Sequence, residues 1–282
     1  MRDVVDTHLH VWDLAGDGYG WVPPGSELHR SFLPDEAVGE LARAGIGSAV
    51  LVQADDTLAD TGFMLEAAAS HDALVGVVGW VRLDTAREAV AQLADHVAHP
   101  AFRGVRHLVH DDPRDDFLAL PDVRRSLREV ARHGLAFDVP DAWPRHLDAV
   151  AALARDLPEL TVVVDHLAKP PRGTDQMAAW ERSLRAVAAA SPRTVAKVSG
   201  LQAPGQPFTE AALRPVLEVA LDAFGPGRLM YGGDWPMTVP QGGYLPHWEV
   251  VSRLVAELSP DEQDALLSGT AQRVYRLTDQ EV

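Results

Sequence analysis

Short apolar runs alternate along the chain with longer segments in which apolar residues recur at the spacing of a helix. Eight of the apolar runs have the length of β-strands, and they lie at residues 3–7, 48–53, 75–81, 102–107, 135–139, 161–165, 194–199 and 228–233. Runs such as Thr161 to Val164 show no alternation with polar residues, which is typical of parallel strands covered by helices on both faces. The pattern therefore predicts a parallel sheet flanked by helices.

The segments between the runs predict amphipathic helices. Residues 144–156 and 175–190 both carry apolar residues at the i, i+3, i+4 and i+7 positions that form one buried face. Eight strand–helix units of about 35 residues each are close to the size of a (β/α)8 TIM barrel, the α/β fold that we predict. Because no low-complexity or Gly/Ser-rich linker divides the chain, we expect residues 1–282 to form a single barrel domain.

Turn-forming residues mark one helix end and one long loop. Ser259 and Pro260, followed by Glu262, predict a capping box at a helix start, and Gly269 is expected to end that helix before Thr270 caps a short last one. Residues 11–34 are rich in Gly and Pro and contain three large aromatic residues. We expect this segment, after the first strand, to be a loop with exposed aromatics that covers the mouth of the barrel.

Composition narrows the partners and the chemistry. The 282 residues include 25 Lys plus Arg and 41 Asp plus Glu, and the net charge of −16 argues against a nucleic-acid partner. The absence of cysteine removes disulfides, thiol nucleophiles and Cys-based metal sites. Residues 1–6 carry charge where a signal peptide is apolar, and no apolar run approaches the roughly 18 residues of a membrane span. We therefore expect a cytoplasmic protein that binds a small molecule and no membrane, and a homo-oligomer is compatible with the sequence.

Polar residues stand at the predicted carboxyl ends of the strands, where barrel enzymes place their active sites. After the first strand come Asp6, His8 and His10, which at a period of two point to the same side. Asp6 either acts directly or orients a histidine. The residues at the other strand ends are Gln53, Asp55, Trp80, Arg82, Arg106, His107, Asp138, Asp165, His166, Lys197, Ser199, Asp234 and Trp235. Titratable groups thus converge from most of the strands.

Several of these residues also fit a purely structural role. Arg106 suits a structural salt bridge as well as a substrate contact. Trp12, Trp80 and Trp235 directly follow strands, so they either belong to the core or offer flat faces to the C–H groups of a sugar-like ligand. The histidines of helices and loops are expected at the surface; they are His29, His71, His96, His99, His110, His133, His146 and His247.

Lysine is rare in this chain. It occurs only at Lys169 and Lys197, while the other 23 of the 25 basic residues are Arg. Because ammonium and guanidinium groups are not interchangeable at a tight site, Lys197 is predicted to face the pocket or the layer behind it. The alternative is a buried lysine paired with a neighbouring carboxylate.

Five segments resemble the amidohydrolase-related (amidohydrolase 2) family. They are Val5 to Asp13, Gly104 to His107, Asp165 to Pro170, Lys197 to Leu201 and Tyr231 to Pro236. The resemblance runs from Asp3 to about Leu277, and within the family it is greatest to the branch of sugar-lactone and 2-pyrone-4,6-dicarboxylate lactonases. It implies a (β/α)8 barrel and a hydrolase of carbohydrate metabolism that opens a lactone, which is a cyclic carboxylic ester.

The resemblance also implies roles for individual residues. His8, His10 and His166 would surround the scissile carbonyl, and Asp234 would take the proton of the attacking water. The residues expected to bind substrate are Trp12, Gln53, Trp80, Arg106, Lys197 and Trp235.

The need for a metal is the main alternative that the sequence leaves open. The wider superfamily binds one or two divalent metals, but the fourth strand here offers Arg106 and His107, and the fifth lacks a histidine, which argues against a binuclear site. A mononuclear site of His8, His10, His166 and Asp234 suits zinc. Because the branch includes metal-independent enzymes, we expect hydrolysis without a cofactor. The alternatives are a mononuclear metal-dependent amidohydrolase or decarboxylase, and a barrel that binds a metabolite without turnover.

Overall fold

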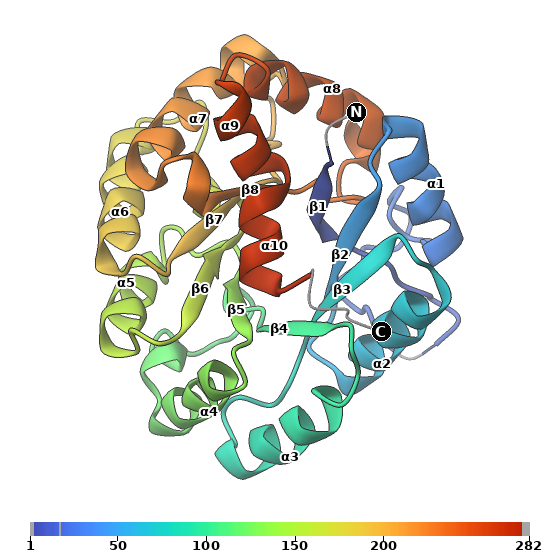
Figure 1. Ribbon diagram of the computed structural model, residues 1–282, viewed down its shortest axis with the longest axis vertical. Coiled ribbons are helices and arrows are strands. Elements are labelled where there is room, and N and C mark those ends of the chain that lie inside the picture. The colour runs from blue at the N-terminus through green and yellow to red at the C-terminus, as the bar shows by residue number, and fades with distance from the viewer. Residues whose placement is uncertain (1–2, 17, 278–282) are drawn as a thin grey trace.

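Eight parallel strands follow one another around a barrel in the order β1 to β8 (Figure 1). The computed structural model describes residues 3–16 and 18–277. The strands are β1 Val5–Leu9, β2 Ser48–Val52, β3 Leu74–Gly79, β4 Phe102–Arg106, β5 Ala136–Val139, β6 Thr161–Val164, β7 Val195–Val198 and β8 Leu229–Tyr231. The predicted (β/α)8 fold is confirmed, and every strand bound lies within two residues of its prediction.

The barrel closes between its first and last strands. An isolated bridge joins Leu9 to Trp235, and two backbone hydrogen bonds flank it, from His10 N to Trp235 O at 2.8 Å and from Asp234 N to His8 O at 2.7 Å. The carboxyl end of β1 is thereby fixed against the segment after β8. This closure brings the motif of the first strand beside the motif that follows the last.

Helices surround the barrel and one of them covers an end of it. They are α1 Pro34–Ala44, α2 Leu58–Ser70, α3 Ala86–His96, α4 Pro121–Arg132, α5 Leu147–Asp156, α6 Met177–Ala190, α7 Glu210–Phe224, α8 Tyr244–Val255, α9 Pro260–Asp264 and α10 Thr270–Tyr275. In Figure 1, α10 lies across the barrel. Its Ala271, Val274 and Tyr275 pack on residues such as Val5 inside the barrel, at the amino ends of the strands. None of the helices in the described residues is long and apolar enough to cross a membrane.

The start of α9 follows the sequence prediction, but its end does not. Ser259 and Glu262 form the expected capping box. Gly269 has helical dihedral angles, with φ −58° and ψ −40°, so it does not end the helix. Instead, the chain continues through a π-helical turn, in which Leu266 and Leu267 are buried, into α10. Burial of these side chains favours continued helix over the left-handed stop that a glycine permits.

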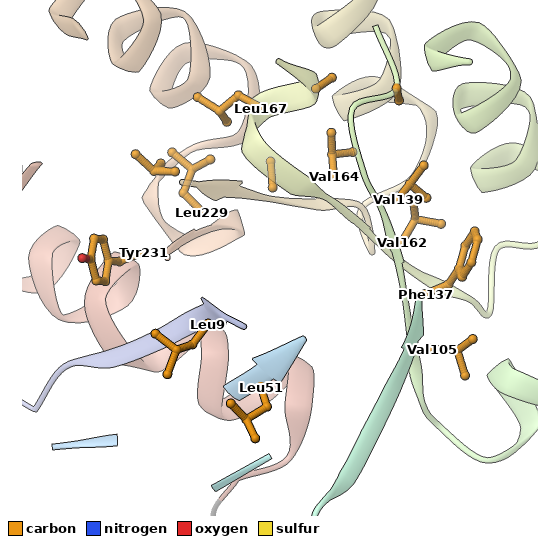
Figure 2. Packing of buried hydrophobic residues seen from close by; sticks show 14 of the residues in the cluster. Leu9, Leu51, Val105, Phe137, Val139, Val162, Val164, Leu167, Leu229 and Tyr231 are labelled. Atoms are coloured by element: carbon orange, nitrogen blue, oxygen red, sulfur yellow. The ribbon is translucent and has the colours of Figure 1, made fainter. Parts of the chain in front are cut away.

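Side chains of the strands alternate between two layers of apolar packing. In β6, Val163 points into the barrel, while Val162 and Val164 pack under the surrounding helices. Figure 2 shows residues of this outer layer on several strands, including Leu51 of β2 and Phe137 of β5. Because both faces of the strands are buried, the strands lack polar alternation, as the sequence indicated.

Candidate active site

Three imidazole rings and one carboxylate meet at the carboxyl ends of β1, β6 and β8. The Nε2 atoms of His8, His10 and His166 lie 3.9, 3.6 and 3.8 Å from Oδ1 of Asp234. The Nε2 atoms of His8 and His10 are 3.1 Å apart. All four residues are at most 5% exposed. The structure thus brings together the four residues that the resemblance implied as catalytic.

The outer nitrogen of each ring has a partner of its own. His10 Nδ1 lies 2.8 Å from the carbonyl oxygen of Val52, which can only accept, so a neutral His10 carries its proton on Nδ1. His166 Nδ1 lies 2.9 Å from Ser199 Oγ, and His8 Nδ1 lies 3.4 Å from Asp165 Oδ1. These partners orient all three Nε2 atoms toward Asp234, an arrangement typical of histidines that ligate metals.

Lys197 lies behind His8 in a fully buried ion network. Its Nζ is 2.6 Å from Asp138 Oδ2, 3.1 Å from Asp165 Oδ1 and 3.2 Å from His8 Nδ1. Burial would raise the pKa of Asp165, but the charge of Lys197 and the contact with His8 hold it well below its usual value. Burial raises the pKa of Asp138 to about 6 despite its contact with Lys197. Arg106 adds a second cation, because its Nε donates to Asp165 Oδ2 at 2.9 Å.

Charges around Asp234 favour its ionised form. Burial alone would raise the pKa of this carboxyl, but the nearby rings of His166 and His10 and the charge of Lys169 hold it well below its usual value. Burial lowers the pKa of His166 to about 4, so its ring is neutral at pH 7. Gln202 Nε2 donates to Asp234 Oδ2 at 3.0 Å, which leaves Oδ1 facing the imidazoles. The centre therefore combines an anionic carboxylate with at least one neutral imidazole.

An unusual left-handed turn carries two of the site residues. His166 to Lys169 all have positive φ, between 50° and 60°, although none is glycine. Such conformations cost roughly 1–2 kcal/mol per residue for L-amino acids. Opposite the turn, Gly200 also has a positive φ, and a Cβ there would lie 2.3 Å from His166 Nδ1. Only glycine fits this close approach without a shift of the histidine.

A pocket of about 160 Å³ opens above the histidines. Its lining comprises His10, Trp12, Trp21, Ala54, Arg106, Leu108, His110, Asp111, Asp141, His166, Lys169, Asp234 and Met237. The loop at residues 11–34 covers one side of it, as expected. The expectation that its aromatics are exposed is wrong for Trp12, which is fully buried beside Phe32, and for Tyr19, which is 7% exposed and donates to Asp60 Oδ1 at 2.8 Å.

The pocket lining contains two of the six residues predicted to bind substrate, Trp12 and Arg106. The lining does not include Gln53, Trp80, Lys197 or Trp235. The structural role considered for Arg106 is also present, since it pairs with Asp165. For Lys197, the structure shows the buried pairing with carboxylates, in the layer behind the pocket.

The remaining three side chains are engaged elsewhere. Trp235 is 2% exposed and packs edge-on against Phe32, with ring centroids 5.3 Å apart. Gln53 is fully buried and donates from Nε2 to Asp56 Oδ1 at 2.7 Å. The indole N–H of Trp80 donates to the imidazole that follows β4 at 3.3 Å. Packing with neighbouring loops, rather than position after a strand, decides where these side chains point.

Asp6 does not share the direction of the two histidines that follow it. Its Oδ1 accepts from the backbone N–H groups of His8 and Gly233 at 2.9 and 2.8 Å, and its Oδ2 accepts from the Tyr244 hydroxyl at 2.6 Å. Burial raises the pKa of Asp6 to about 6. A register shift between Asp6 and Leu9 breaks the period of two. Asp6 therefore fixes the backbones of β1 and β8 rather than an imidazole ring.

Loop residues make up the part of the pocket that the sequence did not indicate. His110, Asp111 and Asp141 follow β4 and β5 at positions beyond the strand ends, where no periodic pattern pointed to them. The prediction of a surface position is wrong for His146, which is fully buried at the start of α5, and for His247, which is 5% exposed. His247 packs against Phe208 of the segment between β7 and α7, with ring centroids 4.1 Å apart, so contact with a neighbouring loop buries it.

The donor set at the centre suits a single divalent metal. His8, His10 and Asp234 each offer one ligand atom, and these atoms all lie within 4.8 Å of one another. Imidazole nitrogens and a carboxylate oxygen are ligands that zinc accepts. A metal would take the place of the proton that lies between the two Nε2 atoms, which are 3.1 Å apart, and the partners on the outer nitrogens would hold both rings in that orientation.

Comparisons with known proteins agree on the family. The sequence matches the amidohydrolase family over residues 5–277. It is 34% identical over 280 residues to an L-fucono-1,5-lactonase of Burkholderia ambifaria, covering 97% of this chain and 95% of that protein. An L-fucono-1,5-lactonase of Burkholderia multivorans is 32% identical over 97% of this chain and 96% of its own. A crystal structure of a Burkholderia multivorans amidohydrolase with bound zinc has a TM-score of 0.84 and 32% identity, covering 97% and 99% of the two chains. The chain therefore belongs to the amidohydrolase family.

Proposed function

We propose that this chain is a lactonase that opens a sugar lactone, such as L-fucono-1,5-lactone, by attack of water. The observation that carries the proposal is the convergence of three imidazoles on the ionised Asp234 at the floor of the pocket. Ester hydrolysis needs a group that takes a proton from water and donors for the developing oxyanion. The alignment with L-fucono-1,5-lactonases over 97% of the chain supports this reaction class.

Asp234 is the general base of the proposed reaction. Gln202 holds Oδ2, so Oδ1 takes the proton while the water oxygen bonds to the carbonyl carbon. When the ring C–O bond breaks, the same oxygen returns the proton to the alkoxide that leaves, and the product is a hydroxy acid. A pKa well below the usual value makes Asp234 a weak base. Its contribution therefore depends on position more than on basicity.

His166 is the best placed of the three imidazoles to stabilise the oxyanion. Its ring is neutral at pH 7, and with Nδ1 accepting from the Ser199 hydroxyl its Nε2–H is free to donate. A neutral His10 presents a lone pair at Nε2 and cannot donate there. His8 is fully buried, and its Nε2 lies 3.1 Å from the Nε2 of His10, whose orientation it helps to fix. The proposal thus assigns the three histidines different tasks, whereas the resemblance implied one shared task.

The same residues would hold a divalent metal. His8, His10 and Asp234 would ligate it, and such an ion would polarise the carbonyl or lower the pKa of bound water. The zinc in the Burkholderia multivorans structure makes a metal-dependent amidohydrolase the second candidate. In keeping with the resemblance, the primary proposal is hydrolysis that needs no metal.

A pH-indicator assay tests the proposal. Purified protein is given L-fucono-1,5-lactone, other aldono-1,4- and 1,5-lactones and 2-pyrone-4,6-dicarboxylate, each measured against its uncatalysed rate. Metal content and activity are measured before and after chelation. We expect sugar-lactone hydrolysis that persists in the metal-free protein. Loss of activity that zinc restores would establish the metal-dependent reaction, and no turnover of any lactone would favour a binding barrel.

Substitution of the proposed base gives a sharper test. We expect Asp234→Asn to lower kcat by about a hundredfold or more, because positioned proton transfer contributes roughly 10²–10⁴ in rate. Asp115→Asn is a matched control, since that side chain is 86% exposed and neither it nor its partner Arg145 belongs to the pocket lining. An Asp234→Asn protein with wild-type melting temperature and wild-type kcat would contradict the assignment.

A further inference from the structure

The proposed hydrolysis leaves one carboxylate of the pocket without a task. Asp141 lies two residues after the end of β5 and lines the pocket. Its Oδ1 is buried and has no hydrogen-bond partner among the residues that the structure describes. Its backbone has a φ of +42°, in the left-handed region. The proposed hydrolysis does not explain a buried carboxylate oxygen without a partner at this place.

The buried oxygen without a partner and the positive φ of Asp141 each cost free energy of folding, and both occur at the same pocket residue. A buried carboxylate oxygen without a donor loses hydration without compensation, and most such groups in folded proteins are satisfied by protein, water or ligand. A left-handed conformation outside glycine is retained where the surrounding structure enforces it, and such strain clusters at binding sites. Because the terminal torsion of aspartate is soft, either oxygen can turn toward a ligand in the pocket.

The charged side chains around the pocket indicate which chemical groups of a ligand would bind beside Asp141. Arg106 is already paired with Asp165 at 2.9 Å, and Lys169 donates to the carbonyl of Gly200 at 3.0 Å. A second carboxylate, Asp111, lies in the same lining. This part of the pocket therefore offers acceptors and negative charge, which suit hydroxyl donors and repel an anionic group.

Asp141 is also close to the reacting centre. Burial lowers the pKa of both His110 and His166, and the negative charge of Asp141 opposes that effect at both rings. Asp141 and His166, the proposed oxyanion donor, line the same pocket, so a substrate bound there lies between groups that include both side chains.

We propose that Asp141 is a specificity residue that accepts a hydrogen bond from a ring hydroxyl of the substrate and thereby selects neutral, polyhydroxylated lactones over lactones that carry a carboxylate. The inference rests on the proposed lactonase function. It deepens that function by naming the residue that distinguishes neutral sugar lactones from lactones that carry a carboxylate.

The test compares three lactones that differ in the group offered to Asp141. They are L-fucono-1,5-lactone, the unsubstituted δ-valerolactone and 2-pyrone-4,6-dicarboxylate. For Asp141→Asn and Asp141→Ala we expect kcat/KM on the sugar lactone to fall by about ten- to a hundredfold, because a hydrogen bond to a charged group is lost. On δ-valerolactone, which has no ring hydroxyl, kcat/KM should change by less than about threefold. Discrimination against the dicarboxylate should shrink. Asp156→Asn is the matched control, because its side chain, at the end of α5, is 63% exposed, pairs with Arg124 and is not part of the pocket lining.

The outcomes separate this inference from the proposed function. Equal losses on the sugar lactone and δ-valerolactone, or no loss on either, would overturn the specificity role while leaving the lactonase intact. A wild-type protein that hydrolyses none of the three lactones would overturn both. A selective loss on the sugar lactone in both Asp141 variants, absent from Asp156→Asn, would establish the role.

Discussion

Replacing Lys197 by methionine should destabilise the protein more than a change at the other lysine. The Lys197→Met side chain keeps the unbranched shape but leaves Asp138 and Asp165, both fully buried, without the ammonium that lies 2.6 and 3.1 Å from them. Removing one partner of a buried ion pair costs about 3–5 kcal/mol, because the remaining charge stays unpaired away from water. Arg106 still pairs with Asp165, so we expect a value near the lower end, about 3 kcal/mol.

Denaturant titration and thermal unfolding measure this loss. At roughly 2–4 °C per kcal/mol, the melting temperature should fall by about 6–12 °C. The double variant Lys197→Met/Asp138→Asn removes the stranded carboxylate as well and should recover part of the loss. Lys169→Met is the control, since the ammonium of Lys169 donates to a carbonyl and has no carboxylate within ion-pair distance among the described residues.

The pH dependence of the loss gives a second check. Asp138 has a folded pKa of about 6, above its usual 3.8, so the folded state holds its proton more tightly than the unfolded state. Stability from this group is present at low pH and is lost as pH rises through the folded pKa. Without Lys197 the pKa should rise further, so the variant should suffer most above pH 7 and least near pH 5. A Lys197→Met protein within about 1 kcal/mol of wild type at pH 8 would refute the reasoning.

Two further predictions concern the turn opposite His166 and the anchor of the loop at residues 11–34. Gly200→Ala should abolish most activity while the protein still folds, because the added Cβ would lie 2.3 Å from His166 Nδ1 at a positive φ; unchanged kcat/KM would contradict this. Asp60→Asn should flatten the fall in stability between about pH 4 and 7, because burial raises the pKa of Asp60 from 3.8 to about 7. At 1.36 kcal/mol per pKa unit, ionising the buried carboxyl costs up to about 4 kcal/mol. Equal slopes of unfolding free energy against pH in the two proteins would rule this out.

The sequence could predict the barrel and the meeting of the three histidines with Asp234 because both follow from local patterns and topology. Runs buried on two faces are apolar throughout, as in Thr161 to Val164, and eight of them leave few other arrangements. Once the strands close into a barrel, their carboxyl ends meet at one face, so His8 and Asp234 become neighbours although they are far apart in the chain.

Side-chain direction and loop geometry could not be predicted in the same way. A register shift in β1 turns Asp6 away from the histidines and toward Tyr244, a residue 238 positions later. Trp235 follows its strand as expected, yet it packs against Phe32 of the long loop. Asp141 lies beyond the strand end in a loop that no periodic pattern describes. These outcomes depend on contacts between distant segments, which spacing along the chain does not encode.

The left-handed turn after β6 shows how a contact between distant segments fixes the local geometry of the site. The four residues from His166 to Lys169 include no glycine, so the sequence carries no local signal for this conformation, and other contacts must stabilise it. Leu167 and Ala168 are fully buried, and the indole N–H of Trp180 in α6 donates to Leu167 O at 2.8 Å. Packing of α6 therefore offsets the strain that directs His166 and Lys169 into the pocket. Trp180, a helix position that the sequence assigns only to the core, thus helps to hold the turn that carries His166, the proposed oxyanion donor.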